Sequence, residues 1–218
     1  MKKFVVILLT VLMVVSLAAC GGEKKPAEER TSDTGNTTEN FDGDVASTEK
    51  DSAEEMKILV AYFSATNTTE GVAEMIADSL PADIYEIVPE QPYTDDDLNY
   101  HDDNSRSTIE MNDSSARPAI SGSVEDMEQY DIVFVGYPIW WGDAPRIVCT
   151  FMESYDFSGK TIVPFCTSGG SGVGSSATNL EALTDGATWL SGTRLNGGSS
   201  RETIVDWVNG LGLDLKAE

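Results

Sequence analysis

Positive charge is scarce in this sequence. Its 218 residues carry 14 Lys and Arg against 37 Asp and Glu, which gives a formal charge of -23. Nucleic-acid binding depends on basic side chains that neutralise phosphates, so this balance excludes a nucleic-acid partner and favours docking to basic proteins. Cysteine is scarce too: three thiols exclude a disulfide-dense scaffold.

The sequence also lacks an apolar run of the ~20 residues that cross a bilayer. The longest run, residues 4–15, follows Lys2 and Lys3 and is apolar except for Thr10, which is typical of an export signal over residues 1–19. Its end, Leu17-Ala18-Ala19-Cys20, resembles the lipobox of bacterial lipoproteins. That resemblance implies lipidation of Cys20 and a membrane-anchored protein on the extracytoplasmic side. An ordinary signal peptide with a chance cysteine is the alternative.

Apolar residues are sparse in the segment that follows. Residues 21–56 hold 11 acidic and 4 basic residues and one aromatic, Phe41. Such a composition buries too little apolar area to offset chain entropy, so we expect residues 20–56 to form the lipidated cysteine and a disordered acidic tether. Residues 57–218 keep 26 acidic and 8 basic residues, a charge of -18, and have the length of one domain.

Short apolar runs alternate with helical patterns throughout residues 57–218. Buried strands are predicted at 57–63, 83–88, 131–137, 161–166 and, less regularly, 187–190. Pro164 inside the fourth run predicts an edge position or a bulge. Strands that alternate with helices indicate an α/β domain, in which a parallel sheet is covered on both faces.

The helical patterns have recognisable beginnings and ends. Val72, Ile76 and Leu80 share one helical face, and Pro81 ends that helix. Further helices are predicted at 145–155, which Pro145 opens, and at 174–183. Ser199 and Glu202 form a capping box that starts the last one.

The stretch from Gln91 to Met127 interrupts this rhythm. It is acidic and has no clear period, and loops of this length are usually functional or disordered. It holds the only histidine, His101, which we interpret as a solvated residue, with a proton donor to substrate as the alternative. Arg106 and Arg117 are expected to pair with acids such as Glu110 rather than bind a substrate.

A hydroxyl-rich loop follows the first strand and directly precedes a helix. At the N-terminus of a helix, free backbone N–H groups and side-chain hydroxyls suit a phosphate. Ordinary N-capping is the alternative interpretation. The candidate ligands are Ser64, Thr66, Asn67, Thr68 and Thr69.

Unusual loops also follow the third and fourth strands. Two adjacent tryptophans in the first of them are costly unless they cover something apolar, with a packing plug as the alternative. Glycines in the other allow close approach of the backbone to a ligand, with a flexible linker as the alternative. The candidates are Pro138, Ile139, Trp140, Trp141 and Gly142 in one loop, and Thr167, Ser168, Gly169 and Gly170 in the other.

Together these three loops resemble those of the flavodoxin family, in a short-chain form close to the flavodoxin-like lipoproteins. Residues 63–68 resemble the family's phosphate loop S/T-x-T-G-N-T, although the usual glycine is missing. Residues 137–142 resemble its aromatic loop, and residues 167–170 the loop at the pyrimidine edge of the flavin. The resemblance covers residues 57 to about 212. It implies FMN as cofactor and a three-layer αβα fold with a five-stranded parallel sheet in the order 2-1-3-4-5.

The function that this resemblance implies is electron transfer by an FMN-binding lipoprotein at the cell surface, with a redox partner that presents a basic docking face. Two alternatives stay open: an FMN-dependent reductase of quinones or similar small acceptors, and a surface binding lipoprotein without flavin. Cys149 and Cys166 are interpreted as buried inert thiols, with a disulfide between them as the alternative.

Replacing Cys20 by Ser removes the only sulfur to which the export signal can attach lipid. We expect this variant to leave the membrane fraction after cell fractionation, because one apolar run of this length does not anchor a chain. Cofactor content should be unchanged. Retention of the variant in the membrane pellet would contradict lipidation at Cys20.

Overall fold

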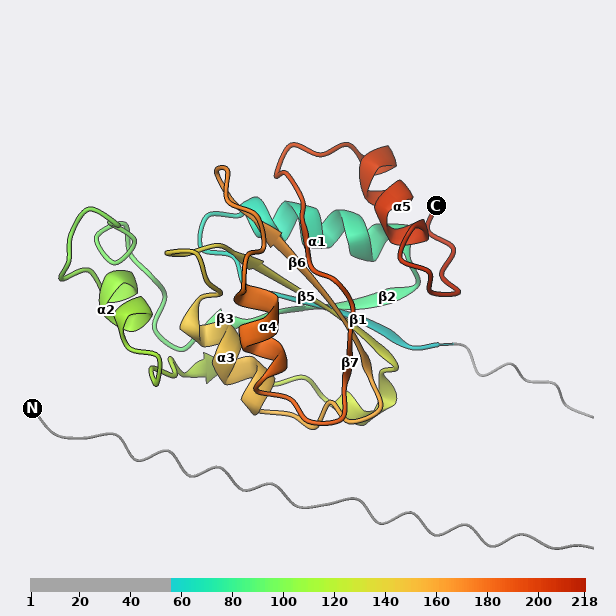
Figure 1. Cartoon of the computed structure of the whole chain (residues 1–218), viewed down its shortest axis with the longest axis horizontal. Helices are drawn as coiled ribbons and strands as arrows, with labels where there is room; N and C mark the ends of the chain where they lie inside the picture. The colour runs from blue at the N-terminus through green and yellow to red at the C-terminus, as the bar shows by residue number, and fades with distance from the viewer. Residues whose placement is uncertain (1–55) are drawn as a thin grey trace, which may run out of the picture. The chain divides into compact units, whose positions relative to one another are not determined.

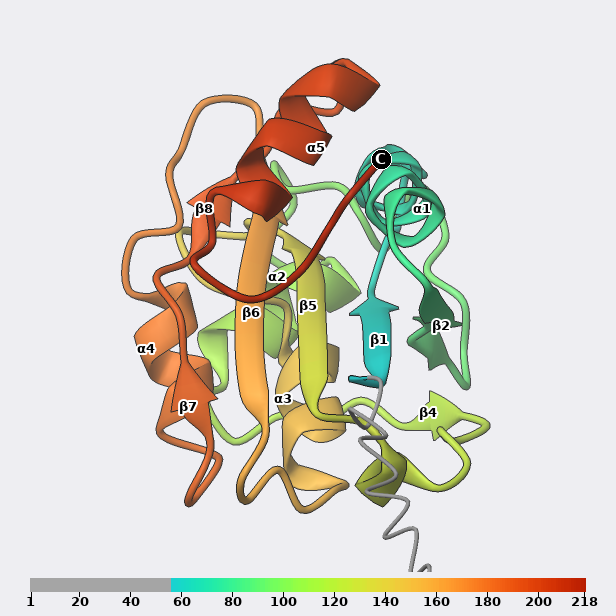
Figure 2. The ribbon, with the colours of Figure 1, turned by 90° about the vertical axis from the view of Figure 1, so that its right-hand side faces the viewer.

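The computed structural model describes residues 56–218 and shows a three-layer α/β domain (Figures 1 and 2). Its central sheet has the strand order β2-β1-β5-β6-β7, with β8 also paired to β6. Every pairing in this sheet is parallel. The order matches the expected 2-1-3-4-5, and the fifth position is shared by two short strands. The sheet consists of β1 (Ile58–Tyr62), β2 (Ala82–Glu86), β5 (Ile132–Pro138), β6 (Thr161–Thr167), β7 (Thr188–Trp189) and β8 (Thr193–Arg194).

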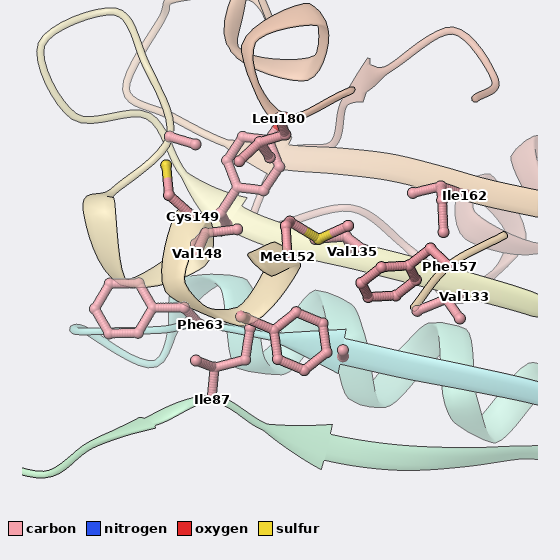
Figure 3. Close-up of a cluster of buried hydrophobic side chains, with 14 of the residues drawn as sticks. Phe63, Ile87, Val133, Val135, Val148, Cys149, Met152, Phe157, Ile162 and Leu180 are labelled. Carbon is pink, nitrogen blue, oxygen red and sulfur yellow. The ribbon is translucent and has the colours of Figure 1, made fainter. Parts of the chain in front are cut away.

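The interiors of the central strands are apolar, as expected for parallel strands buried on both faces, and threonines stand at the two ends of β6. On β5, Val133 and Val135 belong to the core layer beneath α3, whereas Ile132 and Phe134 belong to the layer beneath α1 and α5. Figure 3 shows the first of these layers, where Val148 and Met152 of α3 lie with the valines of β5. The alternation along the strand therefore specifies two cores, one on each face of the sheet.

The helices cover the two faces in pairs, α1 with α5 on one face and α3 with α4 on the other (Figure 1). Pro145 precedes α3 as predicted, and α1 ends at Ser79, with Leu80 as its C-cap directly before Pro81. The capping box predicted at Ser199 was wrong by one residue. Ser200 is the N-cap of α5, and its hydroxyl accepts a hydrogen bond from the Thr203 amide at 3.3 Å. The helices are α1 (Thr68–Ser79), α2 (Arg106–Asn112), α3 (Arg146–Glu153), α4 (Ser176–Glu181) and α5 (Arg201–Asn209).

Pro164 does not lie on an edge strand, so the edge position predicted from the sequence was wrong. β6 lies between β5 and the β7/β8 position. The carbonyls of Ile162 and Cys166 accept hydrogen bonds from the amides of Leu190 and Leu195, both at 2.9 Å. Every second residue of β6 therefore points its backbone N–H and C=O groups toward the β7/β8 position, and Pro164 is one of these residues. Pro164 has no N–H to offer there, and the neighbouring strand is interrupted opposite it, between Trp189 and Thr193. The proline can lie inside the sheet because the edge strand is divided into β7 and β8, with no ladder hydrogen bond required opposite Pro164.

The stretch 91–127 is ordered, although its sequence has no clear period. It contains α2, whose N-cap Ser105 accepts from the Thr108 amide, and β4 (Ile120–Ser121). β4 pairs with β3 (Val88–Pro89) in a separate two-stranded antiparallel sheet. The strand predicted at 83–88 therefore ends at Glu86 and continues into this second sheet. Figure 1 places α2 at the end of the central sheet where the loops after β5 and β6 emerge.

The export signal, Cys20 and the tether lie outside the described residues and stay predictions. Within residues 56–218, no helix combines the length and the hydropathy needed to cross a membrane.

Gly136 is tightly packed against the neighbouring strand of the sheet. A Cβ at this position of β5 would lie 2.2 Å from Cζ of Phe165 on the neighbouring strand. We expect Gly136→Ala to lower the free energy of unfolding by about 1–3 kcal/mol or more, because the ring is fully buried and cannot move aside. Denaturant unfolding measures the change.

Gly71 provides the matched control for Gly136. It lies in α1, and an added Cβ meets no atom within 4 Å. Gly71→Ala should be neutral or stabilising by up to ~1 kcal/mol, since alanine is the better helix former. Equal stability of the Gly136→Ala variant and the parent protein would contradict the packing described here.

Candidate cofactor site

The hydroxyl-rich loop begins α1 without using its side chains as caps. The N-cap residue is Asn67, whose φ of 60° lies in the left-handed region and whose side chain makes no capping hydrogen bond. Asparagine tolerates this conformation, so the loop turns without a glycine. Thr66 and Thr68 are exposed, and their hydroxyls lie 3.4 Å apart. The capping alternative therefore fails, and these hydroxyls and the first amides of α1 face solvent together.

The tryptophan loop is a tight hairpin turn. Trp140 and Asp143 exchange both backbone hydrogen bonds, at 3.0 and 2.9 Å, and the two residues between them have φ of 48° (Trp141) and 83° (Gly142). Two positive φ values are the signature of a type I′ turn. A bulky residue such as tryptophan is rarely found in this conformation, and such strain concentrates at functional sites. The turn leaves the Trp141 side chain 48% exposed.

The two tryptophans have different roles. The ring of Trp140 packs edge-on against Phe63 at 5.5 Å and against Tyr93 at 5.3 Å, with interplanar angles of 85° and 86°. The packing interpretation therefore holds for Trp140, which joins the insert to the end of β1. Trp141 makes none of these contacts and is the tryptophan that the turn presents to solvent.

A buried hydroxyl pair connects the first and third loops. Oγ1 of Thr69 and Oγ1 of Thr167 lie 2.8 Å apart, and both residues are almost fully buried. Thr69 is in the first turn of α1, and Thr167 is the last residue of β6. Since each hydroxyl satisfies the other, the pair fixes the spacing between the two loops.

The three loops surround a cleft with two adjoining lobes. The first is a cavity of about 410 Å³, and the second one of about 830 Å³. Both are lined by Thr66, Tyr100, Pro138, Ile139 and Trp140. The first, called the apolar lobe here, is completed by Ser64, Ala65, Thr69, Leu98, Ser107 and Trp141. The second, called the polar lobe, is completed by Asn67, Thr68, Gly71, Thr167, Ser168, Gly169, Asn196, Gly197 and Gly198.

Most of the residues predicted from the sequence line one lobe or the other. The exceptions are Gly142 and Gly170, which line neither. Sequence reasoning missed Leu98, Tyr100 and Ser107 of the insert and the loop 196–198. The signals were present but weak: a tyrosine inside an acidic stretch, and the pair Gly197-Gly198 shortly before the last predicted helix.

The cleft contains no charged side chain. Although residues 57–218 carry 26 acidic and 8 basic residues, neither lobe is lined by Asp, Glu, Lys or Arg. In so acidic a domain, exclusion of carboxylates from the cleft avoids the strong short-range repulsion that an anion would meet beside a carboxylate. The polar lobe offers hydroxyl and amide groups instead.

The charged candidates of the insert lie outside the cleft. Arg106 pairs with Glu110 at 2.7 Å and lies 4.1 Å from the ring centre of Tyr93. Arg117 pairs with Glu153 at 2.6 Å, so the expected pairing of both arginines with acids is confirmed. His101 is exposed and contacts Tyr100 rather than a lobe.

Tyr93 joins the charged pair of the insert to the aromatic loop. Its hydroxyl donates to Glu110 at 2.5 Å while its ring packs on Trp140. Burial and the bond to the Glu110 carboxylate raise the pKa of Tyr93 well above its usual range, so the phenol stays protonated. The insert is thereby held beside the cleft through α2.

Both described cysteines are free and buried, which excludes the disulfide between them. Burial raises the pKa of Cys166 to about 11 and also raises the pKa of Cys149. Thiols with raised pKa values stay protonated, and protonated thiols are poor nucleophiles. This fits the interpretation of both as inert.

Comparison with known proteins finds relatives over nearly the whole described range. The family model described as flavodoxin matches residues 57–211. A candidate flavoprotein from Bacteroides eggerthii is 46% identical, with a TM-score of 0.69 over 73% of this chain and 100% of its own. One from Bacteroides uniformis is 46% identical, with a TM-score of 0.68 over 71% of this chain and 98% of its own.

A more distant structure shares the fold. A flavoprotein from Lactobacillus acidophilus, solved in complex with FMN, is 21% identical, with a TM-score of 0.55 over 73% of this chain and 100% of its own. A search of curated proteins gave no match.

The Thr69–Thr167 pair predicts a measurable coupling between two loops of the cleft. Thr69→Val keeps the shape but leaves the buried Thr167 hydroxyl unpaired, so stability should fall by about 1–3 kcal/mol. Thr69→Ser keeps the hydroxyl and serves as control. The double variant Thr69→Val/Thr167→Val should cost less than the sum of the single variants in denaturant unfolding. Additive losses would show that the hydroxyls are not coupled.

Proposed function

Because the chain belongs to the flavodoxin family, we propose that it binds FMN in the two-lobed cleft and transfers electrons. The observation that carries this proposal is the uncharged cleft in an acidic domain, polar in one lobe and lined by tryptophans and Leu98 in the other. FMN has the matching parts: a terminal phosphate, a polar ribityl chain and a flat aromatic ring. When bound, FMN supplies the redox chemistry, and the protein supplies binding, orientation and electrostatics.

The polar lobe fits the phosphate and the ribityl chain. The hydroxyls of Thr66 and Thr68 and the first amides of α1 are the donors for the phosphate, and the positive end of the helix dipole adds to them. Thr167 and Ser168 lie across the lobe, where the third loop leaves the sheet. Because these donors are neutral, they hold the phosphate without compensating its charge.

The apolar lobe fits the ring. Trp141 is the exposed aromatic side chain of the tight turn, and Leu98 and Tyr100 of the insert line the same lobe. Aromatic contacts of this kind contribute roughly 0.5–1.5 kcal/mol beyond the burial of area. The strained turn is stabilised by its two backbone bonds, so Trp141 is held in place before the ring arrives.

The electrostatic surroundings favour an electron donor. The domain carries a charge of -18, and neither lobe contains a cation that would stabilise a reduced, anionic flavin. Negative surroundings oppose the negative charge that a flavin gains on reduction, so they lower the reduction potential of the bound flavin. We propose a redox partner with a basic docking face that approaches the exposed Trp141 and Tyr100. Lipidation at Cys20 would hold the domain at the outer face of the membrane.

We propose a single-electron carrier rather than a two-electron reductase, because one peptide of the tight turn is free to rotate beside the cleft. The Asp143 amide is engaged with the Trp140 carbonyl, so the free peptide of the turn is the one between Trp141 and Gly142. Rotation of this peptide would carry Gly142 from its φ of 83° to a negative value, which glycine allows. The same rotation changes ψ of Trp141, whose positive φ makes the rotated turn strained at that residue. The turn could thus offer either the Trp141 carbonyl or the Gly142 N–H to a bound flavin. The carbonyl would accept a hydrogen bond from a ring nitrogen that gains a proton on reduction.

Loss of the hydroxyls at Thr66 and Thr68 tests the binding mode. The purified protein should be yellow, and its extracted flavin should be FMN. Thr66→Ala/Thr68→Ala should weaken FMN far more than riboflavin, because each hydrogen bond to a charged group contributes roughly 1.5–3 kcal/mol. Fluorescence titration of the apoprotein with both flavins measures this. Equal losses for both flavins would mean that the loop does not hold the phosphate.

A reductive titration separates carrier from reductase. With a carrier we expect two well-separated one-electron couples. Gly142→Ala should widen their separation, because alanine is strained at the present φ of 83° but not at the negative φ of the rotated turn. Gly170→Ala is the control, since Gly170 is exposed, lies outside both lobes and has open space around an added Cβ. A single two-electron couple in the parent protein would favour the reductase.

A further inference from the structure

A fourth loop, residues 196–198, reaches the polar lobe from the far edge of the sheet. It follows β8, whose pairing with β6 continues into a hydrogen bond from the Leu195 amide to the Cys166 carbonyl at 2.9 Å. Because Thr167 begins the third loop at the next residue, the third and fourth loops leave the sheet side by side. Asn196, Gly197 and Gly198 all line the polar lobe, together with Thr66 and Thr68.

Gly197 touches the phosphate loop directly. A Cβ at Gly197 would lie 2.4 Å from Cγ2 of Thr68, so no side chain fits there while Thr68 keeps its present rotamer. Threonine is branched at Cβ, and rotation that moves the methyl away also turns the hydroxyl. Gly197 therefore permits the rotamer in which the Thr68 hydroxyl has its present direction, and any larger residue would exclude it. Its φ is not in the left-handed region, so the close approach is the reason for a glycine here.

Asn196 contributes a polar group to the same lobe. Its side-chain oxygen accepts from the Gly198 amide at 3.3 Å, and its backbone carbonyl accepts from the Ser199 amide at 2.8 Å. With the oxygen directed at its own loop, the carboxamide nitrogen is left as a hydrogen-bond donor. The residue that lines the lobe at this point is thus neutral and offers N–H groups, as an anion requires.

We propose that residues 196–198 form a fourth wall of the cofactor site that makes it selective for the phosphorylated flavin over riboflavin. Asn196 donates a hydrogen bond to the phosphate, and Gly197 is a positioning residue that leaves the space in which the Thr68 hydroxyl keeps its present direction. The inference rests on the proposed binding of FMN. It adds that the phosphate is recognised by residues 196–198, which distinguish FMN from riboflavin.

The first test compares Gly197→Ala with the parent apoprotein in fluorescence titrations with FMN and with riboflavin. The added methyl should turn the Thr68 hydroxyl away, so FMN should bind about tenfold more weakly or worse, as for the loss of one hydrogen bond to a charged group. Riboflavin should bind as before. Gly172→Ala is the control, because Gly172 is exposed, lies outside both lobes and has open space around an added Cβ. FMN affinity equal to that of the parent would overturn the role of Gly197.

A second substitution tests the contact itself. Thr68→Ser removes the methyl that meets position 197 and keeps the hydroxyl. In the double variant Thr68→Ser/Gly197→Ala the clash is absent, so FMN affinity should return close to that of Thr68→Ser alone. A merely structural loss caused by alanine at 197 would not be rescued, and an unrescued double variant contradicts the proposal.

A charge at position 196 tests the wall even if Gly197→Ala does not fold. Asn196→Asp keeps the oxygen that accepts from Gly198 and replaces the donor by a negative charge. FMN should bind at least tenfold more weakly, whereas riboflavin should be unaffected. Equal effects on both flavins, or none, would overturn the proposal.

The outcomes for the fourth wall and for the proposed function can be told apart. If the parent protein binds FMN and needs Thr66 and Thr68 but tolerates both the Gly197 and the Asn196 substitutions, the fourth wall fails and the proposed function stands. If the parent does not bind FMN, both fail.

Discussion

The parallel register of β1, β5 and β6 is the constraint on which the site depends. Tyr62 pairs with Gly136, and Gly136 pairs with Phe165, so the three strands end at the same edge of the sheet. Burial on both faces prevents these strands from slipping, because a shift of one residue would exchange the two cores. Gly136 allows this pairing only because it has no side chain where the Phe165 ring lies. The core thus places the loops that line the cleft at one edge of the sheet, and contacts such as the Thr69–Thr167 pair then fix their spacing.

The cleft shows how a strongly acidic protein can present a site for an anion. The carboxylates are distributed over the surface, and none lines either lobe, while the polar lobe is lined by hydroxyls, glycines and asparagines. Neutral donors hold a phosphate without compensating its charge. In the proposed function, the same choice serves binding and leaves the negative charge of the domain uncompensated near the ring, as an electron donor requires.

Much of this arrangement could be predicted from the sequence because local patterns determine it. Apolar runs gave the buried strands, and unusual residues after three of them gave the loops at one edge. The features that were missed depend on contacts between distant segments. α2 packs through Arg106 and Tyr93, which no period reveals, and Gly197 is explained only by Thr68, 129 positions away in the sequence. Pro164 lies inside the sheet because a different strand is interrupted to accommodate it.

The position of FMN in the cleft is the central claim, and the indole N–H signals of the four tryptophans in a ¹H–¹⁵N NMR titration test it most directly. Trp140 and Trp141 line the cleft, whereas Trp189 and Trp207 lie on β7 and α5, outside both lobes. FMN should shift the first two signals and leave the other two in place, with the amides at the start of α1 shifting as well. Unchanged signals of Trp140 and Trp141 at saturating FMN would contradict the account.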